Sequence, residues 1–252
     1  MVRPGETQWI GARAQNGLKI MKLSEVSEPA LEAFYAEVLT PAFPPDELIT
    51  WDELREAAAG DLGPGALVFD GETPLGGMLG EIYPRSGVLL LSYIAVRPEA
   101  RGRGIGQTLL TDVIPRWRAA IGPSLVIAEI EDPRFHQPNV YGDPDARLRL
   151  YHRTGSTLVP MPFFQPSLRP DVPRVFDMLL ICLGETAQTV SAKIVSVFLD
   201  EYFELCEGSE VLTADPDYQV LRQFCQRGDD GRLPLWSLDR VAEIPRFTEV
   251  TR

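Results

Sequence analysis

The residues with the clearest chemical meaning are Arg101-Gly102-Arg103-Gly104-Ile105-Gly106. They follow a nearly continuous apolar run, Val88–Val96, and they precede a helical pattern that starts at Ile105. Glycines allow successive backbone N–H groups to point at one spot, and a helix N-terminus adds the positive end of its dipole. The two arginines add full positive charges. The segment therefore predicts a cradle for a pyrophosphate or a similar anion.

The spacing of the glycines excludes two other phosphate-binding motifs. A dinucleotide fingerprint needs G-x-G-x-x-G. Gln107 stands at the third glycine when the count starts from Gly102, and Leu109 stands there when it starts from Gly104. The GK[ST] of a P-loop is absent. The remaining alternative is a basic, glycine-rich turn that binds no ligand.

Two glutamates at the end of a predicted strand are candidates for moving a proton. Alternation along the strand puts Glu129 and Glu131 on one face. They lie at the carboxyl end of that strand, where open α/β sheets bind ligands. Two nearby carboxylates raise the pKa of one of them, which suits a base. Either glutamate could be this base, Asp132 and Glu81 are weaker candidates, and a solvated strand end is the alternative reading.

Neither of the two histidines is predicted to take part in the chemistry. His136 lies in a loop flanked by prolines, and His152 lies on a helix, about 100° away from its neighbour Tyr151. No cluster of His, Cys and carboxylate residues has the spacing of a metal site, and no G-x-S-x-G is present. We therefore expect no metal.

Strand-like and helix-like segments alternate from about residue 18 to residue 184. Pro115 should kink or interrupt the helix that starts at Ile105. Gly155 should end the last helix of this region. The predicted strands are Leu18–Leu23, Ala66–Phe69, Pro74–Tyr83, Val88–Val96, Leu125–Ile130, Thr157–Phe164 and Val175–Leu183, and the predicted helices are Ser27–Leu39, Trp51–Ala59, Ile105–Ile121 and Ala146–His152.

The pattern changes after Gly184. A helical stripe follows, and Asp215-Pro216 is a typical start for a second helix. These helices could pack on the sheet, cover a ligand site or form a homodimer, because a stripe shows only that one face is buried. We expect an N-terminal extension (1–17), a domain of alternating strands and helices (18–184) and a helical C-terminal extension (185–252). The stripe consists of Val190, Ile194, Val197, Phe198, Tyr202 and Leu205.

The segment Leu91–Gly106 resembles motif A of the GNAT superfamily of acyl-CoA-dependent N-acyltransferases. Arg101, Gly104 and Gly106 fill the family's [QR]-x-x-G-x-[GA]. The strand Leu125–Ile130 and the segment Leu150–Gly155, which is similar to LYxxxG, extend the resemblance. The resemblance implies an α/β (α+β) fold with a central mixed, mostly antiparallel sheet flanked by helices, here with the C-terminal helical extension added.

The resemblance also implies acetyl-CoA as co-substrate and an acetyl transfer in a ternary complex, by direct attack of the amine. Tyr151 matches the family's general acid, and a backbone N–H near Ile94–Val96 serves as an oxyanion donor. Pro144, Ser156 and a long loop at 131–145 depart from the family's pattern near Tyr151. The implied cofactor-binding residues are Ile94, Ala95, Val96, Arg101, Gly102, Arg103, Gly104, Ile105, Gly106 and Gln107.

Composition and charge limit the partners. The net charge of −12 disfavours nucleic acid and membrane surfaces and suits a small-molecule or peptide amine. Three widely spaced cysteines, with no visible signal peptide or membrane span, predict a cytoplasmic protein. We expect an N-acetyltransferase; a transferase of longer acyl groups, a transferase acting on a protein amine and a non-catalytic acyl-CoA sensor are the alternatives. Met161–Pro166 could line the acceptor pocket or be core and turn.

Overall fold

The computed structural model describes residues 17–60, 63–228 and 230–250. They form two compact units. The first comprises residues up to Ile82, Leu91–Gly122 and Val140–Gly142, and the second comprises Tyr83–Leu90, Pro123–Asn139 and the chain from Asp143 onwards. The predicted extension 1–17 lies almost wholly outside the described residues. The division at 17 and 184 remains a prediction.

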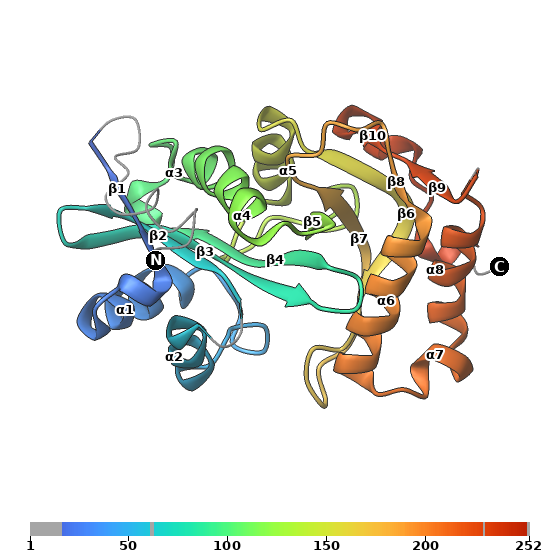
Figure 1. Ribbon diagram of the computed structural model, residues 1–252, viewed down its shortest axis with the longest axis horizontal. Helices are drawn as coiled ribbons and strands as arrows, with labels where there is room; N and C mark the ends of the chain where they lie inside the picture. The colour runs from blue at the N-terminus through green and yellow to red at the C-terminus, as the bar shows by residue number, and fades with distance from the viewer. Residues whose placement is uncertain (1–16, 61–62, 229, 251–252) are drawn as a thin grey trace, which may run out of the picture. The chain divides into compact units, whose positions relative to one another are not determined.

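The first unit is built on antiparallel strands (Figure 1). Strand β2 (Gly65–Asp70) pairs with β1 (Lys19–Lys22) on one side and with β3 (Thr73–Tyr83) on the other. The turn between β2 and β3 falls at Gly71. Strand β4 (Val88–Val96) begins in the second unit and enters the first at Leu91.

Helices cover both faces of these strands, as the surroundings of two neighbouring glycines of β3 show. A side chain at Gly77 would collide with Phe34 of α1, and one at Gly76 would meet Ile105 of α3. Because successive strand residues point to opposite faces, α1 and α3 lie on opposite sides of the sheet (Figure 1). Helix α1 is Glu28–Phe34, and α2 (Trp51–Ala59) packs in the same core; α3 is Ile105–Thr108.

The helix predicted over Ile105–Ile121 is interrupted at the place where Pro115 predicts it. A π-helical turn, Leu109–Val113, separates α3 from α4 (Ile114–Ile121). Pro115 has no N–H, and its ring crowds the carbonyl four residues earlier, so the ordinary helical spacing fails there. The helix predicted over Ser27–Leu39 is also interrupted: its second part is a π-helical turn (Tyr35–Leu39) that follows α1.

The second unit has its own antiparallel strands, in the order β5, β7, β6, β10. Their bounds are Leu125–Glu131, Val175–Cys182, Thr157–Gln165 and Trp236–Ser237. The register of β6 with β7 shifts between Val159 and Phe163, where two prolines interrupt the donors of β6. Helix α5 (Pro144–Arg153) precedes β6, and a small second sheet joins β8 (Thr189–Ser191) to β9 (Arg232–Pro234).

The helices after residue 184 share one apolar core with β5, β6 and β7. Asp215 caps α8, as predicted, because its carboxylate accepts the N–H of Tyr218 at 2.8 Å. These elements are α6 (Ala192–Glu207), α7 (Val211–Ala214), α8 (Pro216–Gln226), a 3₁₀ helix (Leu238–Glu243) and α9 (Phe247–Val250).

The predicted stripe on the first of these helices is partly wrong. Val190 lies in β8, and Leu205 is 72% exposed. Helix α6 contacts both the strands and α8, so it buries a wider face, to which Val195, Leu199 and Phe203 contribute.

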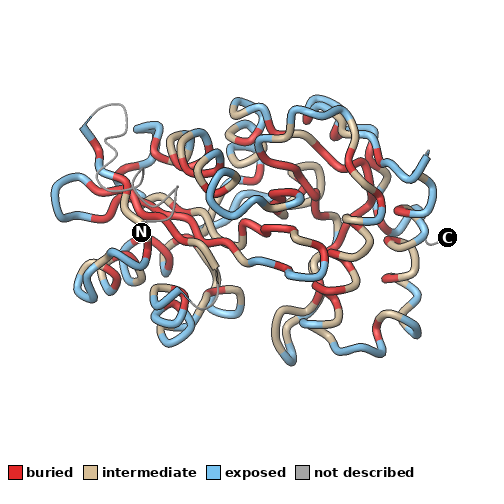
Figure 2. The backbone as a smooth tube through the Cα atoms, viewed as in Figure 1, coloured by how far each residue is buried: buried red, intermediate tan, exposed pale blue. Residues whose placement is uncertain are grey.

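The chain is thus a mixed α/β protein with mostly antiparallel strands flanked by helices, and further helices follow residue 184. The longer strands, β2 to β7, are buried along most of their length (Figure 2). No helix in the described part of the chain has the length and hydropathy that crossing a bilayer requires.

Candidate active site

The loop between β4 and α3 has the backbone geometry of an anion cradle. Gly102 and Gly104 both have φ of +79°, a left-handed conformation that strains other residues. Gly104 is also the residue that caps α3. A Cβ built on either glycine meets no atom within 4 Å. The loop is therefore open on the side where a ligand would approach its backbone.

The start of α3 presents backbone donors at this loop. The first amides of a helix have no carbonyl partner within the helix, and Gly104 has no side chain with which to bond them. Buried Ile105 packs against β3 and fixes the position of the helix start. The N–H groups of Ile105, Gly106 and Gln107 are thus placed to bind an anion, and a diphosphate fits this donor set.

Three arginines stand on or near the cradle, and two of them are already paired. Arg103 forms an ion pair of 3.2 Å with Asp70, which lies at the end of β2. Arg97, next to the end of β4, is paired with Glu37. Arg101 is exposed. A diphosphate must compete with Asp70 for Arg103, so the acidic residue reduces the positive charge of the cradle.

The end of β4 carries Ile94, Ala95 and Val96, which the resemblance implies as cofactor-binding residues. Ala95 is buried, whereas the side chains of Ile94 and Val96 are partly exposed. The N–H of Arg97 bonds to the carbonyl of Leu75 at 2.8 Å, which holds the end of β4 on β3. Tyr93 donates its hydroxyl to the carbonyl of Glu47 at 2.7 Å and so anchors the segment between α1 and α2.

Tyr151, in the second unit, is a buried phenol on α5. Asp143 caps this helix by accepting the N–H of Asp145 at 2.9 Å. Burial raises the pKa of Tyr151 to about 12, and the nearby charge of Arg147 offsets part of the rise. At neutral pH the hydroxyl is protonated, so Tyr151 can donate a proton and cannot accept one.

Glu129 lies in a small polar cluster. One of its oxygens, Oε2, accepts hydrogen bonds from Gln165 on β6 and from Tyr202 on α6, both at 2.9 Å. Burial, and next the charge of Glu129, raises the pKa of Tyr202 well above its ordinary value, so its hydroxyl stays a donor. Strand alternation pointed to Glu129 but not to its partners: no spacing in the sequence pointed to Tyr202, and Gln165 is marked only as a polar residue at the end of a buried strand.

Glu131 has different partners. Its Oε2 accepts from Arg147 at 3.2 Å, and its Oε1 lies 4.0 Å from Nδ1 of His136. The register of β5 with β7 is unbroken from Ile127 to Glu131, so Glu129 and Glu131 point to the same face of the strand. Each carboxylate nevertheless has its own set of donors.

The predicted site residues thus fall into two groups. Arg147 interacts with both Tyr151 and Glu131, which brings these two residues into one local site in the second unit. The cradle belongs to the first unit. Asp132, a weaker candidate for the base, is buried and held by Arg134. Among the described residues, no group of three or more His, Cys, Asp or Glu side chains could hold a metal ion.

Comparison with known proteins gives one family match. Residues 29–141 match the model of the acetyltransferase (GNAT) family. No curated protein matches the sequence significantly.

Similar solved structures include a putative acetyltransferase of the GNAT family from Bacteroides thetaiotaomicron, with 21% identity, 62% of this chain and 81% of that chain covered, and a TM-score of 0.47. The ribosomal-protein-S18-alanine N-acetyltransferase from Escherichia coli has 17% identity, coverage of 68% and 98%, and a TM-score of 0.46. A GNAT family acetyltransferase from Elizabethkingia anophelis with acetyl-CoA bound has 14% identity, coverage of 67% and 99%, and a TM-score of 0.46.

Proposed function

We propose that this chain, which carries a domain of the GNAT acetyltransferase family over residues 29–141, transfers an acetyl group from acetyl-CoA to a primary amine. The family match supports acetyl transfer from acetyl-CoA in general. The amine acceptor and direct attack within a ternary complex are our inference.

The observation that carries the proposal is the cradle at 101–106. Two left-handed glycines, a helix start with no side-chain cap and open space beside the backbone suit the pyrophosphate of acetyl-CoA. The predicted cofactor contacts are the N–H groups of Gly102 to Gln107, the side chains of Arg101 and Arg103, and the backbone of Ile94 to Val96. Each of these stays a proposal.

The second unit supplies the proposed proton chemistry. The amine nitrogen bonds to the thioester carbon, the C–S bond breaks, and the thiolate of CoA receives a proton. Tyr151 suits the last task because burial keeps its hydroxyl protonated. The ammonium form of the acceptor must first lose a proton, and Glu131 is the better placed of the two candidate bases. Glu129 already accepts two buried donors, which suits a positioning role.

The acidic balance of the chain supports a cationic acceptor, either a small molecule or a peptide amine. A cytoplasmic location remains a prediction. The homodimer also remains a prediction. Part of the stripe that could form its interface is already buried, because α6 packs in the core of its own chain.

The test is release of free thiol from acetyl-CoA across a panel of primary amines. We expect Tyr151→Phe to lower kcat and kcat/KM together, by about 10²-fold or more, with little change in acetyl-CoA affinity. Tyr35→Phe is the matched control, because Tyr35 packs on Trp51 in the first unit. CoA binding without thiol release for any amine would favour the non-catalytic sensor. Parental turnover by Tyr151→Phe would remove Tyr151 from the mechanism.

A further inference from the structure

We propose that His136 is the residue that relieves Glu131 of the proton taken from the acceptor amine. This inference rests on the proposed function, and it extends the site to a loop that departs from the family's pattern. It also reverses the expectation that His136 has no chemical role.

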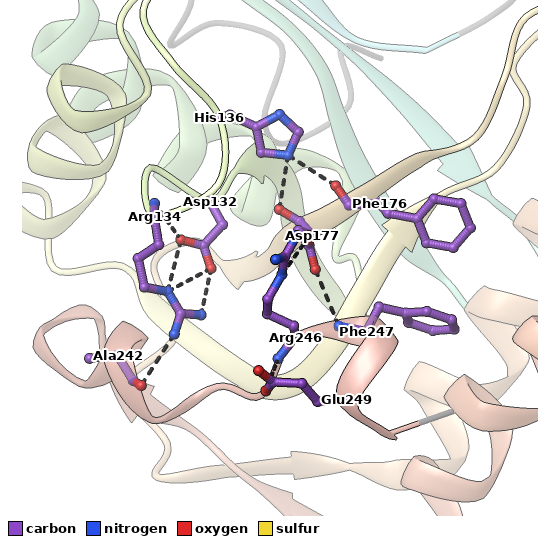
Figure 3. A network of polar contacts seen from close by, with 9 residues as sticks. All are labelled: Asp132, Arg134, His136, Phe176, Asp177, Ala242, Arg246, Phe247 and Glu249. Carbon is purple, nitrogen blue, oxygen red and sulfur yellow. Dashed lines mark hydrogen bonds and ion pairs between the residues drawn. The ribbon is translucent and has the colours of Figure 1, made fainter. Parts of the chain in front are cut away.

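The hydrogen bonds of His136 define which ring nitrogen carries the proton. Its Nε2 lies 2.9 Å from the carbonyl oxygen of Phe176 and 3.2 Å from that of Asp177 (Figure 3). Carbonyl oxygens can only accept, so Nε2 must donate. In the neutral ring, Nδ1 therefore holds the lone pair, and Nδ1 is the nitrogen that lies 4.0 Å from Oε1 of Glu131.

The loop that carries the ring is held by its own turn. The carbonyl of Asp132 accepts the N–H groups of Phe135 and His136, both at 3.0 Å. The carboxylate of Asp132 accepts Nε and Nη2 of Arg134, and Nη1 of Arg134 donates to the carbonyl of Ala242 at 3.2 Å. These bonds fix the backbone from which the imidazole projects (Figure 3).

The carbonyl partners of the ring are held equally firmly. Asp177 has a φ of +55°, a conformation that costs free energy outside glycine and persists where neighbours enforce it. Its carbonyl also accepts the N–H of Asp132 at 3.2 Å. Its carboxylate accepts Nη2 of Arg246 at 2.9 Å and the N–H of Phe247 at 3.2 Å. So many contacts around one residue suit a group that must orient a ring.

The charges around the ring leave one carboxylate facing Nδ1. On its own loop, Asp132 is neutralised by Arg134. Asp177 of β7 is neutralised by Arg246, which directly precedes α9. On β5, Glu131 is shared between Arg147 of α5 and His136. A proton on Nδ1 therefore forms an ion pair with Glu131.

The proton balance of this pair is simple. The carboxylate of Glu131 takes a proton from the ammonium group of the acceptor. The resulting acid passes a proton to Nδ1, which restores the carboxylate and creates an imidazolium. Because the side chain of His136 is 23% exposed, the imidazolium can release a proton to water. A bridging water or a small movement of Glu131 closes the 4.0 Å gap.

The kinetic test uses the two histidines of the chain as a matched pair. In His136→Gln, the side-chain amide can still donate to the two carbonyls, but the base at Nδ1 is lost. We expect kcat to fall about tenfold, below the 10²-fold or more that a direct acid or base supplies, with acetyl-CoA affinity unchanged and a weaker fall of kcat at low pH. His152→Gln changes an exposed ion pair with Asp239 and should behave as the parent. A parental kcat and pH profile in His136→Gln would overturn the proposal.

A second readout needs no activity. Ring ¹⁵N NMR of the parent should show His136 as the Nε2–H tautomer at high pH. In Glu131→Gln the ¹⁵N resonance of Nδ1 should shift, because the carboxylate that faces this nitrogen is gone, while the ring resonances of His152 stay unchanged. The Nδ1–H tautomer, or an Nδ1 resonance that does not respond to Glu131→Gln, would overturn the role of His136. A parent that releases no thiol would instead overturn the proposed function, so the two failures are distinguishable.

Discussion

A buried carboxylate on α6 should make a large contribution to stability. Glu201 binds the turn between β3 and β4: its Oε1 accepts the N–H of Arg85 at 2.8 Å, and its Oε2 accepts the N–H and the hydroxyl of Ser86, both at 3.1 Å. In Glu201→Gln, only one side-chain oxygen remains, so the amide NH₂ must face one of the two backbone N–H donors. A buried donor left without an acceptor costs about 1–3 kcal/mol, and loss of charge weakens the remaining bond.

We therefore expect Glu201→Gln to lower the free energy of unfolding by about 2–4 kcal/mol. The measurement is urea unfolding of parent and variant, monitored by circular dichroism. The two proteins must show the same dependence of unfolding free energy on urea concentration. Glu204→Gln is the control one turn away: Glu204 pairs with the same Arg85, but its side chain is 38% exposed against 10% for Glu201, so we expect less than about 1 kcal/mol. If the two variants lost equal amounts of unfolding free energy, the argument that Glu201 needs both of its carboxylate oxygens as acceptors would be refuted.

Gly104→Val should abolish the rise in melting temperature that saturating CoA causes, because valine strains the left-handed cap of α3 and fills the open side of the cradle. The control Gly122→Val, at the left-handed cap of α4, should keep that rise. A retained rise in Gly104→Val would contradict the cradle. Asp70→Asn should tighten CoA binding in calorimetry at low salt by up to about fivefold, the worth of an exposed ion pair, because it releases Arg103, and unchanged affinity would show that Arg103 does not bind the ligand. Burial raises the pKa of Tyr151 from 10.0 to about 12, so the folded state favours the neutral phenol; the stability this gives is complete below pH 10 and is lost as the pH rises through 12. The parent should therefore lose more stability than Tyr151→Phe between pH 10 and pH 12 in urea unfolding, and parallel losses would contradict this.

Local patterns predicted the elements well wherever one chemical cause dominates. The apolar run Val88–Val96, whose first four residues are buried, predicted β4, and Asp215-Pro216 predicted the start of α8. Pro115 predicted the break between α3 and α4, because a missing N–H acts whatever surrounds it. The buried face of α6 was harder to predict from the sequence, because both the strands and α8 pack on this helix and widen its buried face.

The chemistry was predictable only where it is local in sequence. The cradle is a continuous segment, so its glycines and arginines stood out together. The partners of the glutamates are not local: Tyr202 lies 73 positions from Glu129, and the carbonyls that orient His136 lie 40 and 41 positions from it. A histidine between prolines looks like an ordinary loop residue until the fold shows what each ring nitrogen faces.

The bond from Arg134 to Ala242 joins residues 108 positions apart, and Asp177 is bound by Arg246 and Phe247. During translation, the cradle and the strand that carries Glu131 leave the ribosome long before these later residues exist. The turn around His136 therefore gains these supports only after the residues around Ala242 and Arg246 have been made. On the roles proposed above, a nascent chain completes the segment proposed to bind CoA well before it completes the support of its proposed proton acceptor.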